Sequence, residues 1–297
     1  MPTIVETIAE GAARLGAAGV AEARRTAGVL LGHALGLDRA YLLTRPHEEV
    51  DEARYQEYLR LVERRAAGEP LQYITGHQEF YGLDFIVKPG ALIPRPETEF
   101  LVERVINLAQ AETAAYDLSD KRGQLIVDVG TGSGCIAVTV AAFVKNARVI
   151  AIDISRAAIE VARANAERHN VADRIEFLEG DLLEPLQERA FEASVDFIAS
   201  NPPYVDESKP ELVQREVRDW EPRVALYGGA DGLDFYRRLL NDAPKYLKPR
   251  GYMIIEIGYS QLDAIRNLID ATALELIDVT SDLQGIPRTL TLRKPGE

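Results

Sequence analysis

The chain has 297 residues, 46% of them hydrophobic, so it is long enough to form one large domain with its own core and a smaller one. Aspartate and glutamate (47) outnumber lysine and arginine (34), and the formal net charge of -13 disfavours a nucleic-acid partner. The single cysteine excludes an internal disulfide and, with only four histidines, disfavours a metal site, so we expect none.

We expect a cytoplasmic protein. No stretch of about 18 apolar residues occurs, so no membrane span is predicted. Residues 1–6 do not combine a basic region with an apolar core, so no signal peptide is visible. A lone cysteine fits a reducing compartment.

Residues 1–70 are predicted to form a small helical domain. Alanine, leucine, glutamate and arginine dominate this segment, and its apolar residues recur at helical spacing. Arg60, Arg64 and Arg65 cluster late in the third predicted helix. These arginines form either a solvated face or a docking surface for a partner.

Residues 71–93 are predicted to connect two domains through a β-hairpin. Tyrosine, isoleucine, phenylalanine and valine become frequent, and strands are expected at 78–81 and 85–87 with a turn near Gly82. Pro96 and the carboxylates that follow it suit the first turn of the next helix.

After Arg122 the pattern alternates between strand and helix, which is typical of an α/β fold with a parallel sheet covered on both faces. The expected strands are 125–129, 149–152, 175–178, a run that begins at Val195, 252–257, 274–279 and 289–292. The expected helices are 135–144, 156–169, 233–247 and 262–269, with a turn at 249–251. Residues 94–297 therefore make up the larger domain.

A glycine-rich loop follows the first of these strands. Three glycines at alternate positions allow positive φ angles and let the backbone approach a ligand at the start of the next helix. The spacing is G-x-G-x-G and not the G-x-G-x-x-G of dinucleotide binders, so the loop alone is a weak signal for a cofactor. The candidate cofactor residues in it are Asp128, Gly130, Thr131, Gly132, Ser133 and Gly134.

Two further carboxylates follow the next two strands. Asp153, which precedes Ile154, is placed to accept hydrogen bonds from both hydroxyls of a ribose. Asp181 is placed to accept from an adenine amino group, with Leu182 covering the ring. We count all four residues as candidate cofactor contacts. Because aspartate also favours helix caps and turns, a capping role stays open for both carboxylates.

The strand from Val195 ends at Asn201-Pro202-Pro203-Tyr204, because neither proline can donate a hydrogen bond to a β-ladder. The prolines fix their own φ angles and push Asn201 toward extended backbone, so its carboxamide is displayed rigidly. The Asn201 oxygen and the Pro202 carbonyl could accept both hydrogens of a planar NH2 group, against which Tyr204 could pack. The alternative is a rigid exit turn without chemistry.

These four residues are the candidate substrate-binding residues. Asn201, Pro202 and Tyr204 are the candidate catalytic ones, and Asn201 is also a candidate cofactor contact. In open α/β sheets ligands lie across the carboxyl ends of the strands, so the four strand ends should converge. A cofactor with adenine and ribose but no pyrophosphate, beside a cradle for an NH2 group, points to S-adenosylmethionine.

On several motifs, and over nearly its whole length, the chain resembles the family of release-factor glutamine N5-methyltransferases. The motifs are Pro70-Leu71-Gln72-Tyr73-Ile74, Gly76 with Glu79-Phe80, Leu92 through Glu99, Asp128 through Gly134, Asn201 through Tyr204, and Glu221-Pro222 leading into Gly228 through Leu233. The resemblance implies a class I seven-stranded Rossmann-like methyltransferase domain, preceded by a helical domain that helps to recognise the substrate.

The resemblance also implies an activity. A methyl group would pass from S-adenosylmethionine, leaving S-adenosylhomocysteine, to the glutamine of the Gly-Gly-Gln motif in bacterial class I peptide chain release factors. Such an enzyme modulates translation termination. We expect it to act as a monomer.

Two other functions fit parts of the pattern. The amine cradle would suit an exocyclic amine of DNA or RNA, which would have to be flipped out of its stack. The net charge and the lack of a basic, aromatic-rich reading domain disfavour this acceptor. A cofactor-sensing or protein-binding module without turnover would gain nothing from holding an acceptor amine, and the presence of methyl transfer separates it from an enzyme.

Overall fold

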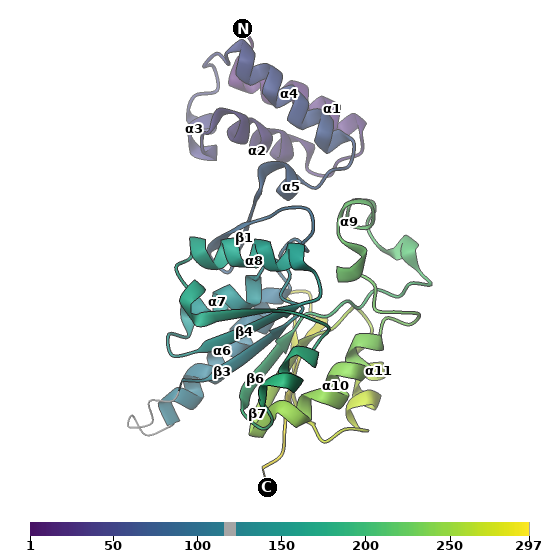
Figure 1. The fold of residues 1–297 in the computed structure, drawn as a ribbon. Helices are drawn as coiled ribbons and strands as arrows, with labels where there is room; N and C mark the ends of the chain where they lie inside the picture. Colours follow the sequence, from purple (N-terminus) through teal and green to yellow (C-terminus); the bar gives the residue numbers. More distant parts are fainter. Residues whose placement is uncertain (116–122, 297) are drawn as a thin grey trace. The chain divides into compact units, whose positions relative to one another are not determined.

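The computed structural model describes residues 1–115 and 123–296, and the chain divides into two compact units (Figure 1). The first unit consists of Met1–His77 and Gln214–Trp220, and the second of Gln78–Val213 and Glu221–Glu297. No helix in the described ranges is both long and apolar enough to cross a membrane.

The first unit is a helical bundle. Its helices are α1 (Ile4–Ala17), α2 (Ala23–Leu35), α3 (Arg39–Thr44), α4 (Glu52–Ala66), α5 (Leu71–Thr75) and α9 (Arg215–Trp220). Thr3 and Glu6 form a capping box at the start of α1, and Asp51 caps α4. Leu31 and Tyr58 are fully buried between the helices.

Two details of the bundle differ from the sequence prediction. The expected third helix is α4, because the short helix α3 precedes it. The expected boundary at residue 70 lies before α5, whose Leu71 and Ile74 pack in the core of the bundle. The first unit therefore extends beyond residue 70, because Leu71 and Ile74 pack against its other helices.

The clustered arginines of α4 form ion pairs with carboxylates of their own unit. The pairs are Arg60 with Glu57, Arg64 with Glu69 at 2.6 Å, and Arg65 with Glu216 at 2.6 Å. Arg60 and Arg64 are exposed to solvent, in agreement with a solvated face, whereas Arg65 is mostly buried. A docking role stays a prediction.

The expected hairpin is confirmed. Strands β1 (His77–Phe80) and β2 (Leu83–Ile86) form a two-stranded sheet. Tyr81 and Gly82 both have positive φ, 52° and 74°, as a two-residue type I′ turn requires.

The second unit contains one seven-stranded sheet in the order β5-β4-β3-β6-β7-β9-β8, which confirms the predicted α/β fold (Figure 1). The strands are β3 (Leu125–Val129), β4 (Arg148–Asp153), β5 (Ile175–Glu179), β6 (Val195–Ser200), β7 (Leu247–Glu256), β8 (Glu275–Ser281) and β9 (Pro287–Arg293). The first five strands in the sheet order run parallel, whereas β9 is antiparallel to both β7 and β8.

Helices cover both faces of this sheet. They are α6 (Thr98–Ala115), α7 (Cys135–Phe143), α8 (Arg156–Arg168), α10 (Asp234–Tyr246) and α11 (Leu262–Ile269). Ile126 and Phe197 face a core shared with α6, α7 and α8, while their neighbours Val127 and Ile198 face a core shared with α10 and α11. Because strand side chains alternate between faces, near-continuous apolar runs are the expected sequence of strands covered on both sides.

The predicted turn at 249–251 is wrong, because these residues lie within β7. The strand begins at Leu247, which pairs with Val195, and the next pair is Tyr252 with Phe197. The extra residues form a bulge in which Arg250 has a φ of 68°. Residues 249–251, predicted as a turn, thus interrupt the pairing register of β7 but do not end the strand.

One buried side chain ties the hairpin to the sheet unit. Asn165 of α8 accepts from the Ile86 N–H at 2.7 Å through Oδ1 and donates through Nδ2 to the carbonyls of Ile86 (3.0 Å) and Ser133 (2.9 Å). Ser133 belongs to the glycine loop, so the Asn165 side chain forms hydrogen bonds with both β2 and the glycine loop.

Asn165→Ala should lower the free energy of unfolding by about 2–3 kcal/mol, because it leaves buried backbone groups unsatisfied. Urea denaturation followed by circular dichroism measures this change. The matched control is Asn241→Ala, at an exposed side chain that donates a hydrogen bond to its neighbour Asp242. Equal midpoints for the two variants would contradict the role of Asn165.

Candidate active site

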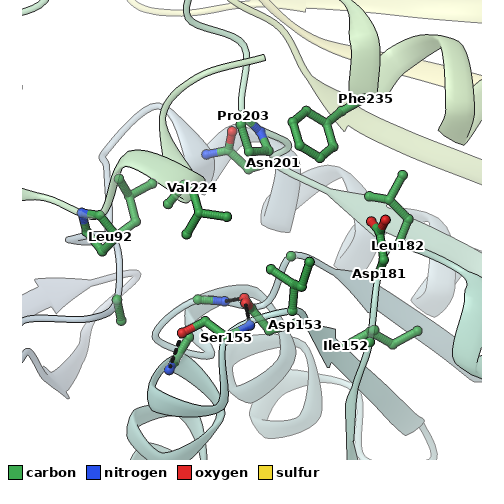
Figure 2. Close-up of a pocket in the computed structure, with 18 of the residues that line it drawn as sticks. Leu92, Ile152, Asp153, Ser155, Asp181, Leu182, Asn201, Pro203, Val224 and Phe235 are labelled. Atoms are coloured by element: carbon green, nitrogen blue, oxygen red, sulfur yellow. Dashed lines mark hydrogen bonds between the residues drawn. The ribbon is translucent and has the colours of Figure 1, made fainter. Parts of the chain in front are cut away.

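An open pocket lies in the second unit at the carboxyl ends of β3, β4, β5 and β6 (Figure 2). Val129 pairs with both Ile152 and Ser200, so the residues that follow these three lie side by side at one edge of the sheet. The predicted residues that line the pocket are Gly130, Gly132, Asp153, Ile154, Asp181, Leu182, Asn201 and Pro203. The four strand ends therefore meet as the sequence predicts.

Six predicted site residues are not among those lining the pocket. They are Asp128, Thr131, Ser133, Gly134, Pro202 and Tyr204. Gly134 has a φ of 82°, and a Cβ there would come within 3.0 Å of Ala162, so its glycine permits contact between α7 and α8. Gly134 therefore supports the site from behind, whereas the contact of the Pro202 carbonyl with a substrate amide stays a prediction.

Asp128 braces the glycine loop. Its Oδ2 accepts from the Thr131 hydroxyl at 2.6 Å and from the Ala137 N–H at 3.1 Å, whereas Oδ1 has no partner among the described residues. Burial raises the pKa of this fully enclosed carboxyl to about 7. Asp128 therefore supports the loop at the start of α7.

Asp153 connects the glycine loop to the start of α8 (Figure 2). Its two oxygens accept from the N–H groups of Gly132 and Ser155, each at 2.8 Å. The side chain that caps α8 is Ser155, which accepts from the Ala158 N–H. Burial raises the pKa of Asp153. A carboxylate has about four acceptor positions, so these contacts do not exhaust its capacity, and the contact with ribose hydroxyls stays a prediction.

Asp181 and Leu182 follow β5, the strand next to β4, at whose end Asp153 lies (Figure 2). Its Oδ2 accepts from Nη2 of Arg238 at 2.7 Å, an ion pair that the sequence analysis did not predict. No hydrogen bond to Oδ1 occurs among the described residues, and the contact with an adenine amino group stays a prediction. Leu182 has a φ of 50° and packs partly into the core.

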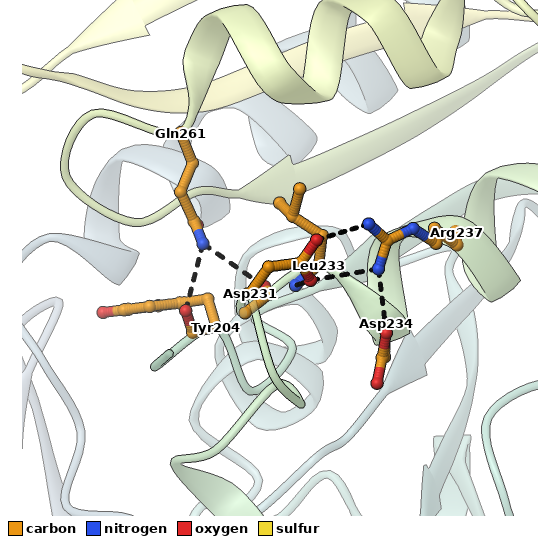
Figure 3. A network of polar contacts seen from close by, with 7 residues as sticks. Tyr204, Asp231, Leu233, Asp234, Arg237 and Gln261 are labelled. Carbon is orange, nitrogen blue, oxygen red and sulfur yellow. Dashed lines mark hydrogen bonds and ion pairs between the residues drawn. The ribbon is translucent and has the colours of Figure 1, made fainter. Parts of the chain in front are cut away.

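The Asn201-Pro202-Pro203-Tyr204 turn is clamped from outside the pocket by Gln261 (Figure 3). Gln261 Nε2 donates to the carbonyls of Tyr204 (3.0 Å) and Gly232 (3.2 Å), and its Oε1 accepts from the Gly258 N–H at 2.9 Å. The Tyr204 ring packs against the core beneath α10 and α11, and burial raises the pKa of its hydroxyl. Packing of this ring on a bound acceptor stays a prediction.

Glycines let the neighbouring loop lie against that turn. A Cβ at Gly228 would come within 2.6 Å of the Pro203 carbonyl oxygen, and one at Gly232 within 2.3 Å of the Tyr204 carbonyl oxygen. Arg237 of α10 pairs with Asp231 of the same loop (Figure 3). The Gly-Gly-Ala-Asp-Gly motif therefore supports the turn from behind.

The Asn201 carboxamide has one end engaged. Its Nδ2 donates to Thr98 Oγ1 at 3.0 Å, and Thr98 Oγ1 donates to Glu256 Oε2 at 2.6 Å. Within the described chain, Oδ1 accepts no hydrogen bond, and Asn201 is among the residues that line the pocket. A side chain presented in this way offers an acceptor to an incoming N–H.

Sequence reasoning missed several residues of the site. Leu92 and Pro222 line the pocket and belong to motifs that carry the family resemblance, so that signal could have identified them. Their segments are joined by Glu221, which accepts from the Ile93 N–H at 3.2 Å and pairs with Arg95. The lining residues Val224, Phe235 and Arg238 carry no local signal.

Comparison with known families matches both parts of the chain. Residues 6–76 match the PrmC N-terminal domain, and residues 120–275 match a methyltransferase domain. The release factor glutamine methyltransferase of Koribacter versatilis is 45% identical over 286 residues, which cover 95% of each chain. That of Geobacter sulfurreducens is 42% identical over 92% of this chain and 90% of its own.

Solved structures show the same fold at lower identity. A methyltransferase from Pyrococcus furiosus is 20% identical, with a TM-score of 0.51 over 81% of this chain and 98% of its own. The catalytic domain of human METTL16 in complex with an RNA hairpin is 19% identical, with a TM-score of 0.53 over 84% of this chain and 83% of its own. These two likenesses concern the fold alone.

The buried Asp128 predicts a pH dependence of stability. Because its pKa rises from 3.8 to about 7 on folding, its contribution to stability is complete below pH 3.8 and is lost as the pH rises through about 7. The unfolding free energy of the wild type should therefore fall, relative to that of Asp128→Asn, between about pH 5 and pH 8. Denaturant titrations across this range measure the difference, with the exposed Asp173→Asn as the charge control. A constant difference for Asp128→Asn would contradict the prediction.

Proposed function

Because the chain belongs to the release factor glutamine methyltransferase family, we propose that it methylates the side-chain amide nitrogen, N5, of the glutamine in the Gly-Gly-Gln motif of class I release factors. It is a methyltransferase that uses S-adenosylmethionine and releases S-adenosylhomocysteine. The observation that carries the choice of acceptor is the Asn201 carboxamide, which lines the pocket. Its nitrogen donates a hydrogen bond to Thr98, and its oxygen has no partner among the described residues.

The residues of the pocket fit S-adenosylmethionine. Asp153 retains acceptor capacity for two ribose hydroxyls, and Asp181 Oδ1 for an adenine amino group. Gly130 and Gly132 present backbone without a side chain, while Ile154, Leu182 and Phe235 supply apolar walls. The bound cofactor supplies an electrophilic methyl group on a sulfonium sulfur.

The chain's own residues activate and position the acceptor. An amide nitrogen is a weak nucleophile because its lone pair is delocalised onto the carbonyl. We assign Asn201 Oδ1 and the Pro202 carbonyl as acceptors for its two hydrogens, which localises electron density on nitrogen and stabilises the positive charge that develops there. Holding the nitrogen in line with the methyl group can lower the barrier by about 7–11 kcal/mol. After bond formation the acidified N–H loses its proton to water.

Release factors act where proteins are translated, so the proposed function places the enzyme in the cytoplasm. A single chain contains every residue assigned above, which supports the expectation of a monomer.

Methyl transfer from labelled S-adenosylmethionine tests the acceptor and Asn201 together. The wild type should label a purified class I release factor on the glutamine and should leave DNA and ribosomal RNA unlabelled. Asn201→Ala should lose about 10²-fold or more in rate, the scale of removing one group that stabilises developing charge. Its affinity for the cofactor should stay measurable by calorimetry. Labelling of nucleic acid alone would contradict the acceptor, and a wild-type rate in Asn201→Ala would contradict the amide cradle.

Asp153→Ala tests the ribose contact. It should weaken S-adenosylmethionine binding by about 1.5–3 kcal/mol, because a charge-assisted hydrogen bond is lost. Isothermal titration calorimetry measures the change, and Asp173→Ala, at an exposed position away from the pocket lining, is the control. Unchanged affinity would remove Asp153 from the ribose site.

A further inference from the structure

Three side chains from distant parts of the sequence form a chain of hydrogen bonds behind the acceptor site. Asn201 follows β6, Glu256 is the last residue of β7, and Thr98 is the first residue of α6. Ser200 pairs with Ile255, so Asn201 and Glu256 leave neighbouring strands at the same level. Thr98 is 2% exposed and Glu256 is 1% exposed. Water therefore does not compete for the contacts between them.

The oxygen and nitrogen ends of a carboxamide have almost the same shape, so packing alone does not choose between them. The choice is made by the hydrogen bonds of the surroundings. At Asn201 the neighbouring group is the Thr98 hydroxyl, which holds one hydrogen and can also accept. The direction of that single hydrogen therefore decides which end of Asn201 faces Thr98.

An ionised Glu256 fixes this direction. A carboxylate only accepts, so the Thr98 hydrogen points to Glu256 Oε2 at 2.6 Å. Thr98 Oγ1 is then left to accept, and the neighbouring Asn201 must present its NH2 group to it at 3.0 Å. The Asn201 oxygen is thereby turned to the opposite side, where an acceptor amide needs it.

We propose that Glu256, acting through Thr98, sets the orientation of the Asn201 carboxamide, and that both are positioning residues for methyl transfer. This inference rests on the proposed function of Asn201. The inference adds one requirement to the proposed function: the Glu256 carboxylate must be ionised for Asn201 to hold the acceptor amide.

Protonation of Glu256 would reverse the chain of donors. A carboxylic acid donates to Thr98, the Thr98 hydrogen then turns to Asn201, and Asn201 presents NH2 to the pocket in place of oxygen. Burial and Glu97 raise the pKa of Glu256 to about 7, while the Thr98 hydrogen bond, Arg288 and Arg95 act in the opposite direction. The other titratable groups around this carboxyl are the Tyr204 and Tyr236 hydroxyls and the Cys135 thiol. Transfer should therefore weaken as the pH falls through about 7.

The test uses the full chain with release factor and saturating S-adenosylmethionine. Thr98→Val should slow single-turnover methyl transfer by about tenfold or more, the equivalent of about 1.4 kcal/mol, with cofactor affinity within about twofold of the wild type. Thr98→Ser restores the hydroxyl and should recover most of the rate. Thr139→Val is the control, because Thr139 is equally buried on α7 and its hydroxyl has no partner among the described residues.

Glu256→Gln supplies a readout that a purely structural role would not change. The wild-type rate should show an acid limb near pH 7, and this limb should be absent in Glu256→Gln, whose side chain does not titrate. A wild-type rate in Thr98→Val, or the same acid limb in Glu256→Gln, would overturn the inference.

A second measurement needs neither an acceptor nor a folded Thr98→Val variant. The side-chain amide hydrogens of Asn201, identified by NMR through their loss in Asn201→Ala, should exchange more slowly with solvent at about pH 8 than at about pH 6, after correction for intrinsic exchange. The same protection at both pH values would overturn the orientation mechanism. A wild type that is inactive on release factor but shows the expected protection would contradict the proposed function and still support this inference.

Discussion

The site depends on a backbone constraint at the end of β6. Proline has no N–H and a fixed φ, so the ladder cannot continue through Pro202 and Pro203, and Asn201 is held where four parallel strands end together. Gln261 and the close-packed glycines at 228 and 232 then prevent the turn from moving away from the sheet. A carboxamide with a free oxygen can position an acceptor only if the scaffold around it holds it in place.

The same edge of the sheet carries a stability cost. Asp128, Asp153 and Glu256 are all carboxyls whose pKa is raised by burial, so ionising each of them opposes folding. Each is nevertheless bonded to a group that shapes the pocket: a loop hydroxyl, a loop N–H, or the hydroxyl that contacts Asn201. The fold therefore places these three carboxyls where they orient the backbone and side chains that line or support the pocket.

Local patterns were enough to predict the sheet and the strand ends. Apolar runs, glycine spacing and the two prolines are short-range features, and they located the pocket residues Gly130, Asp153, Asp181 and Asn201. Contacts between distant segments were not predictable in this way. The sequence predicts a helix start near Thr98 and a strand that includes Glu256. Their hydrogen bonds with each other and with Asn201 form only when the chain is folded.

The differences between sequence and structure have the same origin. The bulge in β7 requires a positive φ at Arg250, a backbone conformation that the sequence does not predict for arginine. The neighbouring strand β6 pairs with β7 on both sides of the bulge. Asp128 and Tyr204 belong to recognisable motifs, but a motif does not state which side of the backbone a side chain occupies. Burial places Asp128 behind the glycine loop, and packing holds the Tyr204 ring against the core.

A crystal structure of the protein with S-adenosylhomocysteine and a peptide containing Gly-Gly-Gln would test the central claim most directly. The account predicts that the glutamine amide nitrogen lies about 2.7–3.2 Å from both Asn201 Oδ1 and the Pro202 carbonyl oxygen. A glutamine amide held by other groups, or facing Asn201 Nδ2, would contradict it.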